Sequence, residues 1–101
     1  MSIVAGLYAG ANETNNVSYT WYKHVVGADK TVTYTEVPGE NDELHEVSGD
    51  GKTLTIYRDA INGYASYKCV ATYNGKTYEA YQDVEDWVDE LQVSLHCTLG
   101  N

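Results

Sequence analysis

The sequence has no phenylalanine and a single proline, and its aromatic residues are ten tyrosines and two tryptophans. Because aromatic and β-branched side chains suit a half-buried pleated surface, this composition indicates β structure. At 101 residues the chain is long enough for one domain and too short for two. Its hydrophobic share of 43% is enough to bury a core, which excludes a chain that is disordered by composition.

Basic residues are scarce, since six lysines and arginines stand against fifteen aspartates and glutamates and give a net charge of −9. Phosphate backbones and anionic lipid head groups repel such a surface. No apolar run is long enough to span a bilayer, and no positively charged start leads into an apolar secretory segment. We therefore expect neither nucleic-acid binding nor insertion into a membrane.

The residue patterns of common metal and catalytic sites are also missing. The three histidines lie far apart, without the H-x-x-x-H or C-x-x-C spacing of zinc sites. The acidic segment 39–52 has enough carboxylates for calcium but lacks the order of an EF-hand loop, so we interpret it as a long solvated loop with a short edge strand. No G-x-S-x-G elbow occurs. The sequence predicts no metal site, no cofactor and no catalytic residue.

Alternation of apolar and polar residues with a period of two recurs along the chain, and helical periodicity does not. The clearest segments of this kind are 3–9, 17–21, 54–56, 65–71 and 91–99. Asn74-Gly75 predicts a type I′ hairpin turn, because both residues tolerate the positive φ values that this turn needs. Many short strands at close spacing predict an antiparallel sandwich or barrel.

Three motifs in order resemble the pattern of the immunoglobulin (Ig) fold: Trp21 in "TWYK", "LTI" at 54–56, and Tyr67 two residues before Cys69. This resemblance implies that Trp21 lies on strand C, and Tyr67 and Cys69 on strand F. It implies strand E for Leu54 and Ile56, and a structural core formed by Trp21, Leu54, Ile56, Tyr67 and Cys69. It also implies a tyrosine corner, in which the Tyr67 hydroxyl bonds back to the backbone at the E–F turn.

The chain departs from this family pattern at two positions. The strand B cysteine of the inter-sheet disulfide would fall near Leu7, and Gly63 replaces the usual aspartate six residues before Cys69. Cys69 is therefore expected to be a buried thiol that packs as a small hydrophobe, which suits folding in a reducing cytosol. Cys97 could pair with Cys69 if the last strand docks beside strand B or G, but two buried thiols are the preferred state.

The order of strands also differs from that of an ordinary Ig domain, because the first strand leads directly to the tryptophan strand. We interpret 1–101 as a single Ig-like domain, with strands B to G in 2–82 and an extra A-type strand at 91–99. That strand could return to its own sheet, exchange with a neighbouring copy, or begin the next repeat of a longer protein. Return is preferred, since an exposed apolar face would aggregate. The expected fold is an all-β, Ig-like antiparallel sandwich of about seven strands.

The stretch 51–80, followed by 91–101, also resembles Ig-like repeats in tail and other structural proteins of bacteriophages and prophages of Gram-positive hosts. Those repeats carry "W-Y-K", "G-K-T-L-T-I" and "Y-K-C-x-V/A" elements without the second cysteine. The resemblance implies a non-enzymatic structural or adhesion module of a virion, assembled in a bacterial cytoplasm. It would act as a spacer or a weak surface-binding domain, with other virion proteins or tandem Ig-like repeats as partners.

Four aromatic residues fall at outward or loop positions, namely Tyr22, Tyr57, Tyr73 and Trp87. With neighbouring acids they could stack on sugar rings and hydrogen-bond to them, so one alternative is a carbohydrate-binding module for cell-surface glycans. Against this, single aromatics are common on β surfaces, and Trp87 could instead cap the core. A further alternative is a eukaryotic cell-adhesion Ig domain at the cell surface, which glycans on the sequons at Asn12 or Asn16 would support.

Overall fold

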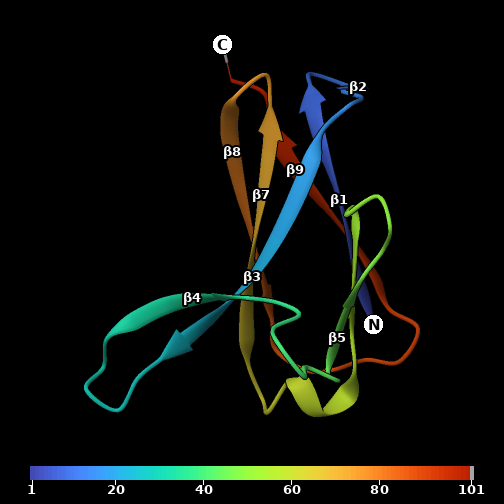
Figure 1. Ribbon diagram of the computed structural model, residues 1–101. Coiled ribbons are helices and arrows are strands. Elements are labelled where there is room, and N and C mark those ends of the chain that lie inside the picture. The colour runs from blue at the N-terminus through green and yellow to red at the C-terminus, as the bar shows by residue number, and fades with distance from the viewer. Residues whose placement is uncertain (101) are drawn as a thin grey trace.

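The computed structural model describes residues 1–100, which form two β-sheets packed face to face (Figure 1). The strands in chain order are β1 (Ser2–Ala9), β2 (Asn12–Glu13), β3 (Ser18–Val26), β4 (Val32–Glu36), β5 (His45–Val47), β6 (Thr53–Ile56), β7 (Ala65–Tyr73), β8 (Lys76–Val84) and β9 (Gln92–Thr98). A single 3-10 turn, η1 (Arg58–Ala60), follows β6. Within residues 1–100, no helix is long and apolar enough to cross a membrane. The prediction of an all-β sandwich is confirmed, with nine strands in place of about seven.

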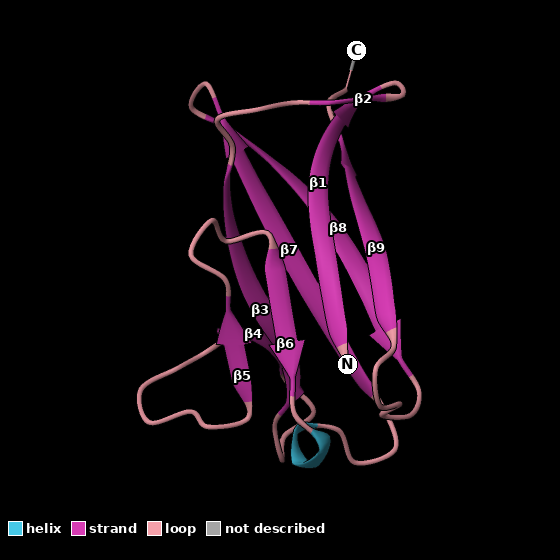
Figure 2. Cartoon of the chain, turned by 90° about the vertical axis from the view of Figure 1, so that its right-hand side faces the viewer, coloured by secondary structure: helices cyan, strands magenta, loops and turns pink. Residues whose placement is uncertain are grey.

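The first sheet has five strands, in the order β2-β1-β6-β5, with β9 paired to β1. Figure 2 shows β1, β5, β6 and β9 of this sheet in front of the second sheet. β6 and β1 run antiparallel, with Ile3 opposite Leu54. The second sheet has the order β4-β3-β7-β8, and all its pairs are antiparallel. Its β7–β8 hairpin turns at Asn74 and Gly75, whose φ angles of 51° and 76° are those of the predicted type I′ turn.

The last strand pairs with β1 of its own chain, and it runs parallel to it. The pairing extends from Ser2 opposite Gln92 to Tyr8 opposite Thr98. β8 ends at the end of the sandwich where β1 begins, so a strand that follows it after a short loop must run in the same direction as β1 (Figure 2). This pair is the one departure from the expected antiparallel arrangement among the strand pairs of residues 1–100.

The core lies between the two sheets. The residues expected to form it are all buried there: Trp21, Leu54, Ile56, Tyr67 and Cys69. The Trp21 indole N–H donates a hydrogen bond of 2.8 Å to the carbonyl oxygen of Gly51. Gly51 has a φ of 78°, and a Cβ at this position would lie 3.1 Å from the Tyr19 carbonyl oxygen. Only glycine adopts this backbone without strain, so the loop before β6 can approach the indole closely.

Candidate functional site

The outer surface of the four-stranded sheet carries aromatic side chains from three of its strands, together with a lysine from the fourth. Strand pairing places Tyr22 of β3 opposite Lys68 of β7, and Lys68 opposite Tyr81 of β8. Tyr34 of β4 lies opposite His24 of β3. Trp21 beside Tyr22, and Tyr67 and Cys69 beside Lys68, are buried in the core, and successive side chains of a strand point to opposite faces. We call this outward group of Tyr22, His24, Tyr34, Lys68 and Tyr81 the tyrosine face.

Lys68 lies at the centre of the tyrosine face. Its ammonium nitrogen is 4.3 Å from the ring centroid of Tyr34 and 5.0 Å from that of Tyr22. The Tyr34 and Tyr81 rings lie 6.1 Å apart at an angle of 60°. An exposed cation over an aromatic ring contributes about 0.5–1 kcal/mol, so Lys68 links the rings of β3 and β4, and Tyr81 of β8 packs against Tyr34. Tyr34 is 38% exposed and Tyr81 51% exposed, which leaves ring area free for a ligand.

Carboxylates surround the rings of the tyrosine face. The Tyr81 hydroxyl donates a 2.9 Å hydrogen bond to Glu79, and this bond raises the pKa of Tyr81. Glu36 of β4 lies opposite Tyr22. Next to the face, the Tyr64 hydroxyl donates to Asp83 at 3.2 Å. The surface thus combines flat apolar rings with carboxylate acceptors, a combination that suits a neutral ligand rich in hydroxyl or amide donors and repels a polyanion.

The structure does not bring the four aromatic residues proposed for glycan binding into one site. Tyr22 belongs to the tyrosine face. Tyr57 is 44% exposed and lies directly before η1. Tyr73 is half-buried against the core at the end of β7. Trp87 lies in the loop between β8 and β9, beside Arg58 of η1. Any glycan contact of the latter three would therefore involve other surfaces than the tyrosine face.

Trp87 covers one end of the core, as the alternative interpretation of this residue has it. Its ring is half-buried, and its indole N–H donates a 2.8 Å hydrogen bond to the carbonyl oxygen of Ile56. The guanidinium group of Arg58, which lies on η1, is 4.8 Å from the centroid of the Trp87 ring. These contacts use the polar edge of the indole and one of its faces to close the bottom of the sandwich.

Sequence reasoning missed most of the tyrosine face. The alternation in 65–71 does place Lys68 outward, but Tyr34 lies in a segment with weak alternation and Tyr81 in the return strand of the hairpin. The sequence does contain one signal. Tyr22 follows the inward residue Trp21, and Tyr81 follows the inward residue Ala80, so both tyrosines point outward. Recognising it requires the register of four strands, which alternation within each strand does not supply.

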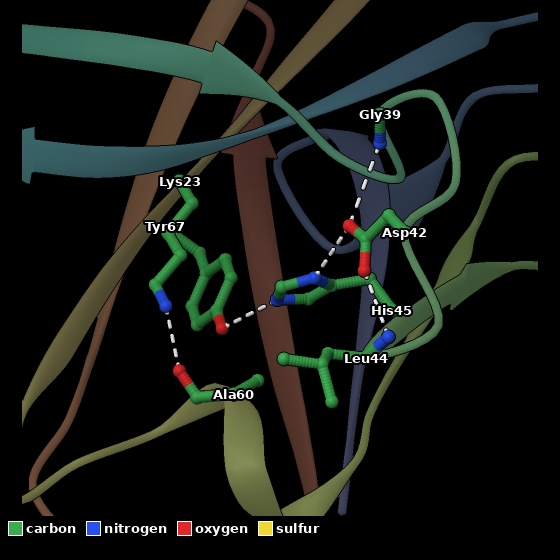
Figure 3. A network of polar contacts seen from close by, with 7 residues as sticks. All are labelled: Lys23, Gly39, Asp42, Leu44, His45, Ala60 and Tyr67. Atoms are coloured by element: carbon green, nitrogen blue, oxygen red, sulfur yellow. Dashed lines mark hydrogen bonds and ion pairs between the residues drawn. The ribbon is translucent and has the colours of Figure 1, made fainter.

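A second polar cluster lies inside the sandwich beneath the acidic loop (Figure 3). The Tyr67 hydroxyl lies 2.8 Å from His45 Nε2, and His45 Nδ1 lies 2.9 Å from Asp42 Oδ2. Asp42 also accepts the backbone N–H groups of Leu44 at 2.7 Å and Gly39 at 3.4 Å. The predicted tyrosine corner is therefore wrong. The short strand β5 places His45 next to the Tyr67 ring. The hydroxyl therefore bonds to the imidazole and not to the backbone of the E–F turn.

Hydrogen bonding fixes the roles in this cluster. A carboxylate can only accept, so His45 Nδ1 carries the proton and Nε2 accepts the Tyr67 hydroxyl hydrogen. Burial lowers the pKa of His45, and Asp42 opposes that effect. Burial raises the pKa of Tyr67, which is fully buried. Burial alone would raise the pKa of Asp42, but hydrogen bonds from Leu44 and His45 outweigh it and lower the pKa. The arrangement ties the acidic loop to the core.

We expect the stability of the protein to fall as the pH drops below about 6.5, the usual pKa of histidine in an unfolded chain. Because the pKa of His45 is lowered in the folded state, the unfolded state binds the proton first, and acid favours unfolding. The charged and titratable groups facing His45 are Asp42 of the loop, Lys23 of β3 and Tyr67 of β7. The slope for one proton is at most about 1.4 kcal/mol per pH unit. Urea unfolding between neutral and mildly acidic pH measures it.

Two histidine variants test the source of this slope. His45→Gln should remove the pH dependence near neutrality, because glutamine does not titrate. His24→Gln changes a histidine of the tyrosine face and should retain the slope. An unchanged slope in His45→Gln would assign the pH dependence to another group.

Two hollows on the surface of residues 1–100 are small. The larger, of about 180 Å³, lies beside β2 and is lined by Asn16, Asp50 and the ion pair of Lys52 with Glu13. Another, of about 150 Å³, is lined by Trp21, Pro38 and their neighbours. Pockets for small molecules usually enclose about 300–1,000 Å³. Neither hollow reaches that size, so the open tyrosine face is the better candidate for binding.

Comparison of the chain with models of protein families, with curated proteins and with solved protein structures finds no match. The resemblance to Ig-like repeats of bacteriophages therefore stays a prediction. The case for the tyrosine face as a binding surface depends on its geometry.

Proposed function

We propose that the chain is a non-enzymatic Ig-like module of a bacteriophage tail or other virion protein, which makes weak surface contacts through the tyrosine face. The observation that carries this proposal is the tyrosine face itself, in which Tyr34 and Tyr81 remain exposed around Lys68. Tyrosine offers a large and rigid contact area at low cost in conformational entropy, together with a hydroxyl for hydrogen bonding. A flat sheet face of this kind suits contact with an extended surface more than a small ligand.

The strand order supports the Ig-like part of the proposal. By the resemblance, β4-β3-β7-β8 would be strands C′-C-F-G and β1-β6-β5 would be B-E-D. Trp21 then lies on strand C, opposite Cys69 on strand F. β9 would take the edge beside strand B that strand A takes in an ordinary Ig domain. It runs parallel to strand B, which is the opposite of the direction of an ordinary strand A. A rigid sandwich with acidic surfaces serves as a spacer, because like charges keep neighbouring modules apart.

In this proposal the contacts of one module are weak, and many copies on one particle make them effective. Linking copies raises apparent affinity by about 10²–10⁴ where the geometry allows simultaneous contact. Cell-surface glycan is the second candidate target, and one observation favours it. Glu36 and Glu79 lie next to the exposed rings, so a sugar ring could stack on a tyrosine while a carboxylate accepts its hydroxyl groups.

A binding experiment with matched variants tests the function. We expect the biotinylated protein, presented as a tetramer on streptavidin, to bind Gram-positive cells more tightly than the monomer does. The double variant Tyr34→Ser/Tyr81→Ser should weaken this binding about tenfold or more, as expected for the loss of central aromatic contacts. Tyr57→Ser is the control, since Tyr57 is exposed but lies outside the tyrosine face.

The same variants on a glycan array separate the two candidate targets. Binding to a defined glycan that the double variant loses would support carbohydrate recognition. Cell binding that needs the tyrosine face but no glycan would support adhesion through protein contacts. Equal binding of the double variant and the wild type would contradict the assignment of the tyrosine face.

A further inference from the structure

The two cysteines of the chain meet between the two sheets. Cys69 belongs to β7 of the four-stranded sheet, where it lies opposite Trp21. Cys97 belongs to β9 of the five-stranded sheet, where it lies opposite Leu7. Both are free thiols with no exposed surface, and each is a neighbour that shifts the pKa of the other. β7 and β9 approach each other across the sandwich.

This contact has the placement that an inter-sheet disulfide needs. Packed sheets lie about 10 Å apart, whereas a disulfide joins Cα atoms about 4.4–6.8 Å apart, so only side chains that face each other at a close approach can form one. Cys69 and Cys97 are both fully buried between the layers, one on each sheet, on strands that approach each other. The sequence contains no other cysteine that could compete for either thiol.

We propose that Cys69 and Cys97 are a redox-active thiol pair that closes to an inter-sheet disulfide and so fastens β9 to β7. This inference is independent of the proposed function. The oxidant is a small-molecule disulfide such as oxidised glutathione. Two S–H bonds of the protein break and one S–S bond forms, while the two electrons and two protons convert the oxidant into two thiols.

The positions of the two strands set the order of the two exchange steps. Cys97 belongs to the edge strand β9, whereas Cys69 belongs to β7, which is paired on both sides with β3 and β8. The Cys97 thiolate therefore attacks the oxidant first, and one thiolate of the oxidant leaves. Cys69 then attacks the sulfur of Cys97 in the mixed disulfide, and its proton passes to the second leaving thiolate.

Access to the buried thiols comes through the edge position of β9. Among residues 1–100, β9 forms strand pairs with β1 alone. Opening an edge strand locally requires less free energy than unfolding the whole domain, so an oxidant can reach Cys97 when β9 detaches. Closure of the disulfide then prevents this opening, because β9 is held covalently to β7. The reduced domain has a detachable last strand, and the oxidised domain does not.

Oxidation of the wild-type protein tests the proposal directly. Reduced protein is incubated with excess oxidised glutathione, the remaining thiols are alkylated in denaturant, and intact mass is measured. We expect the protein to lose the mass of two hydrogen atoms and to resist alkylation, and a peptide map should link Cys69 with Cys97. The melting temperature should rise on the order of 10 °C, because the disulfide lowers the conformational entropy of the unfolded chain.

Two single variants separate the roles of the thiols. Cys69→Ala should stop at a mixed disulfide, with one glutathione on Cys97. Cys97→Ala should react far more slowly, because Cys69 lies on a strand that is paired on both sides and does not detach with β9. If either variant fails to fold, the mass and peptide map of the wild-type protein still decide the question. Two alkylatable thiols after long incubation of the wild type, or disulfide-linked dimers in place of an internal link, would overturn the proposal.

Discussion

Replacing Trp21 with alanine is expected to lower the free energy of unfolding by roughly 3–5 kcal/mol, the usual range for emptying a buried aromatic site. Trp21 is 1% exposed and is the largest of the fully buried side chains. It packs beside Cys69 between the sheets, and its N–H donates to the Gly51 carbonyl oxygen. The variant leaves a cavity and also leaves that carbonyl oxygen without its partner, so the two effects add.

Urea unfolding followed by circular dichroism measures this loss without depending on tryptophan fluorescence. Tyr57→Ala is the control, because Tyr57 is 44% exposed and its truncation should change the free energy by no more than about 0.5 kcal/mol. Since small domains are stable by only about 5–15 kcal/mol, Trp21→Ala could leave little folded protein. Trp21→Phe keeps a ring in the site and should retain a measurable transition. A loss below about 1 kcal/mol in Trp21→Ala would show that the indole is not a core element.

The inward direction of the core side chains could be predicted from the sequence. In a strand, alternation fixes which residues share a face whatever the strand pairs with, so Leu54, Ile56 and Cys69 could be assigned to the core before any pairing was known. The hairpin at Asn74-Gly75 could be predicted for a similar reason, because its φ angles depend on two adjacent residues. These features are local, and the structure has all of them.

Features that depend on contacts between distant segments could not be predicted in this way. The parallel direction of β9 follows from where β8 ends in space, and no pattern within 91–99 encodes it. Tyr67 was expected to bond to the backbone, yet its partner is His45 from a loop without periodicity. The tyrosine face depends on the register of four strands, so its members looked like unrelated surface residues.

The candidate site shows the same limit of sequence reasoning, because residues predicted to act together lie apart in the fold. Tyr57, Tyr73 and Trp87 fall at outward or loop positions in the sequence, but the fold separates them from Tyr22. Trp87 illustrates the physical reason. An indole in a loop lowers its free energy by covering apolar surface while its N–H finds a carbonyl oxygen, here that of Ile56. A loop position therefore does not by itself indicate that an aromatic ring is free for a ligand.

Truncating Leu95 in the last strand is the second variant for which we expect a large effect. Leu95 is 7% exposed and lies opposite Ala5 in the β1–β9 pair. Leu95→Ala should lower the free energy of unfolding by about 2–4 kcal/mol, because it removes the leucine that β9 contributes to the core. Leu91→Ala is the matched control. Leu91 precedes β9 and is 40% exposed, so the same substitution there should change the free energy by less than about 0.5 kcal/mol.

The Leu95→Ala experiment also distinguishes a strand that closes its own domain from one exchanged with a neighbouring copy. If β9 packs on β1 of the same chain, the loss measured by urea unfolding is independent of protein concentration. If it packs on another copy, unfolding is coupled to dissociation, and the apparent stability rises with concentration. We expect no such dependence, together with faster hydrogen exchange of the β9 amides in Leu95→Ala than in the wild type. Equal stability of the Leu95 and Leu91 variants would mean that β9 does not contribute to the core.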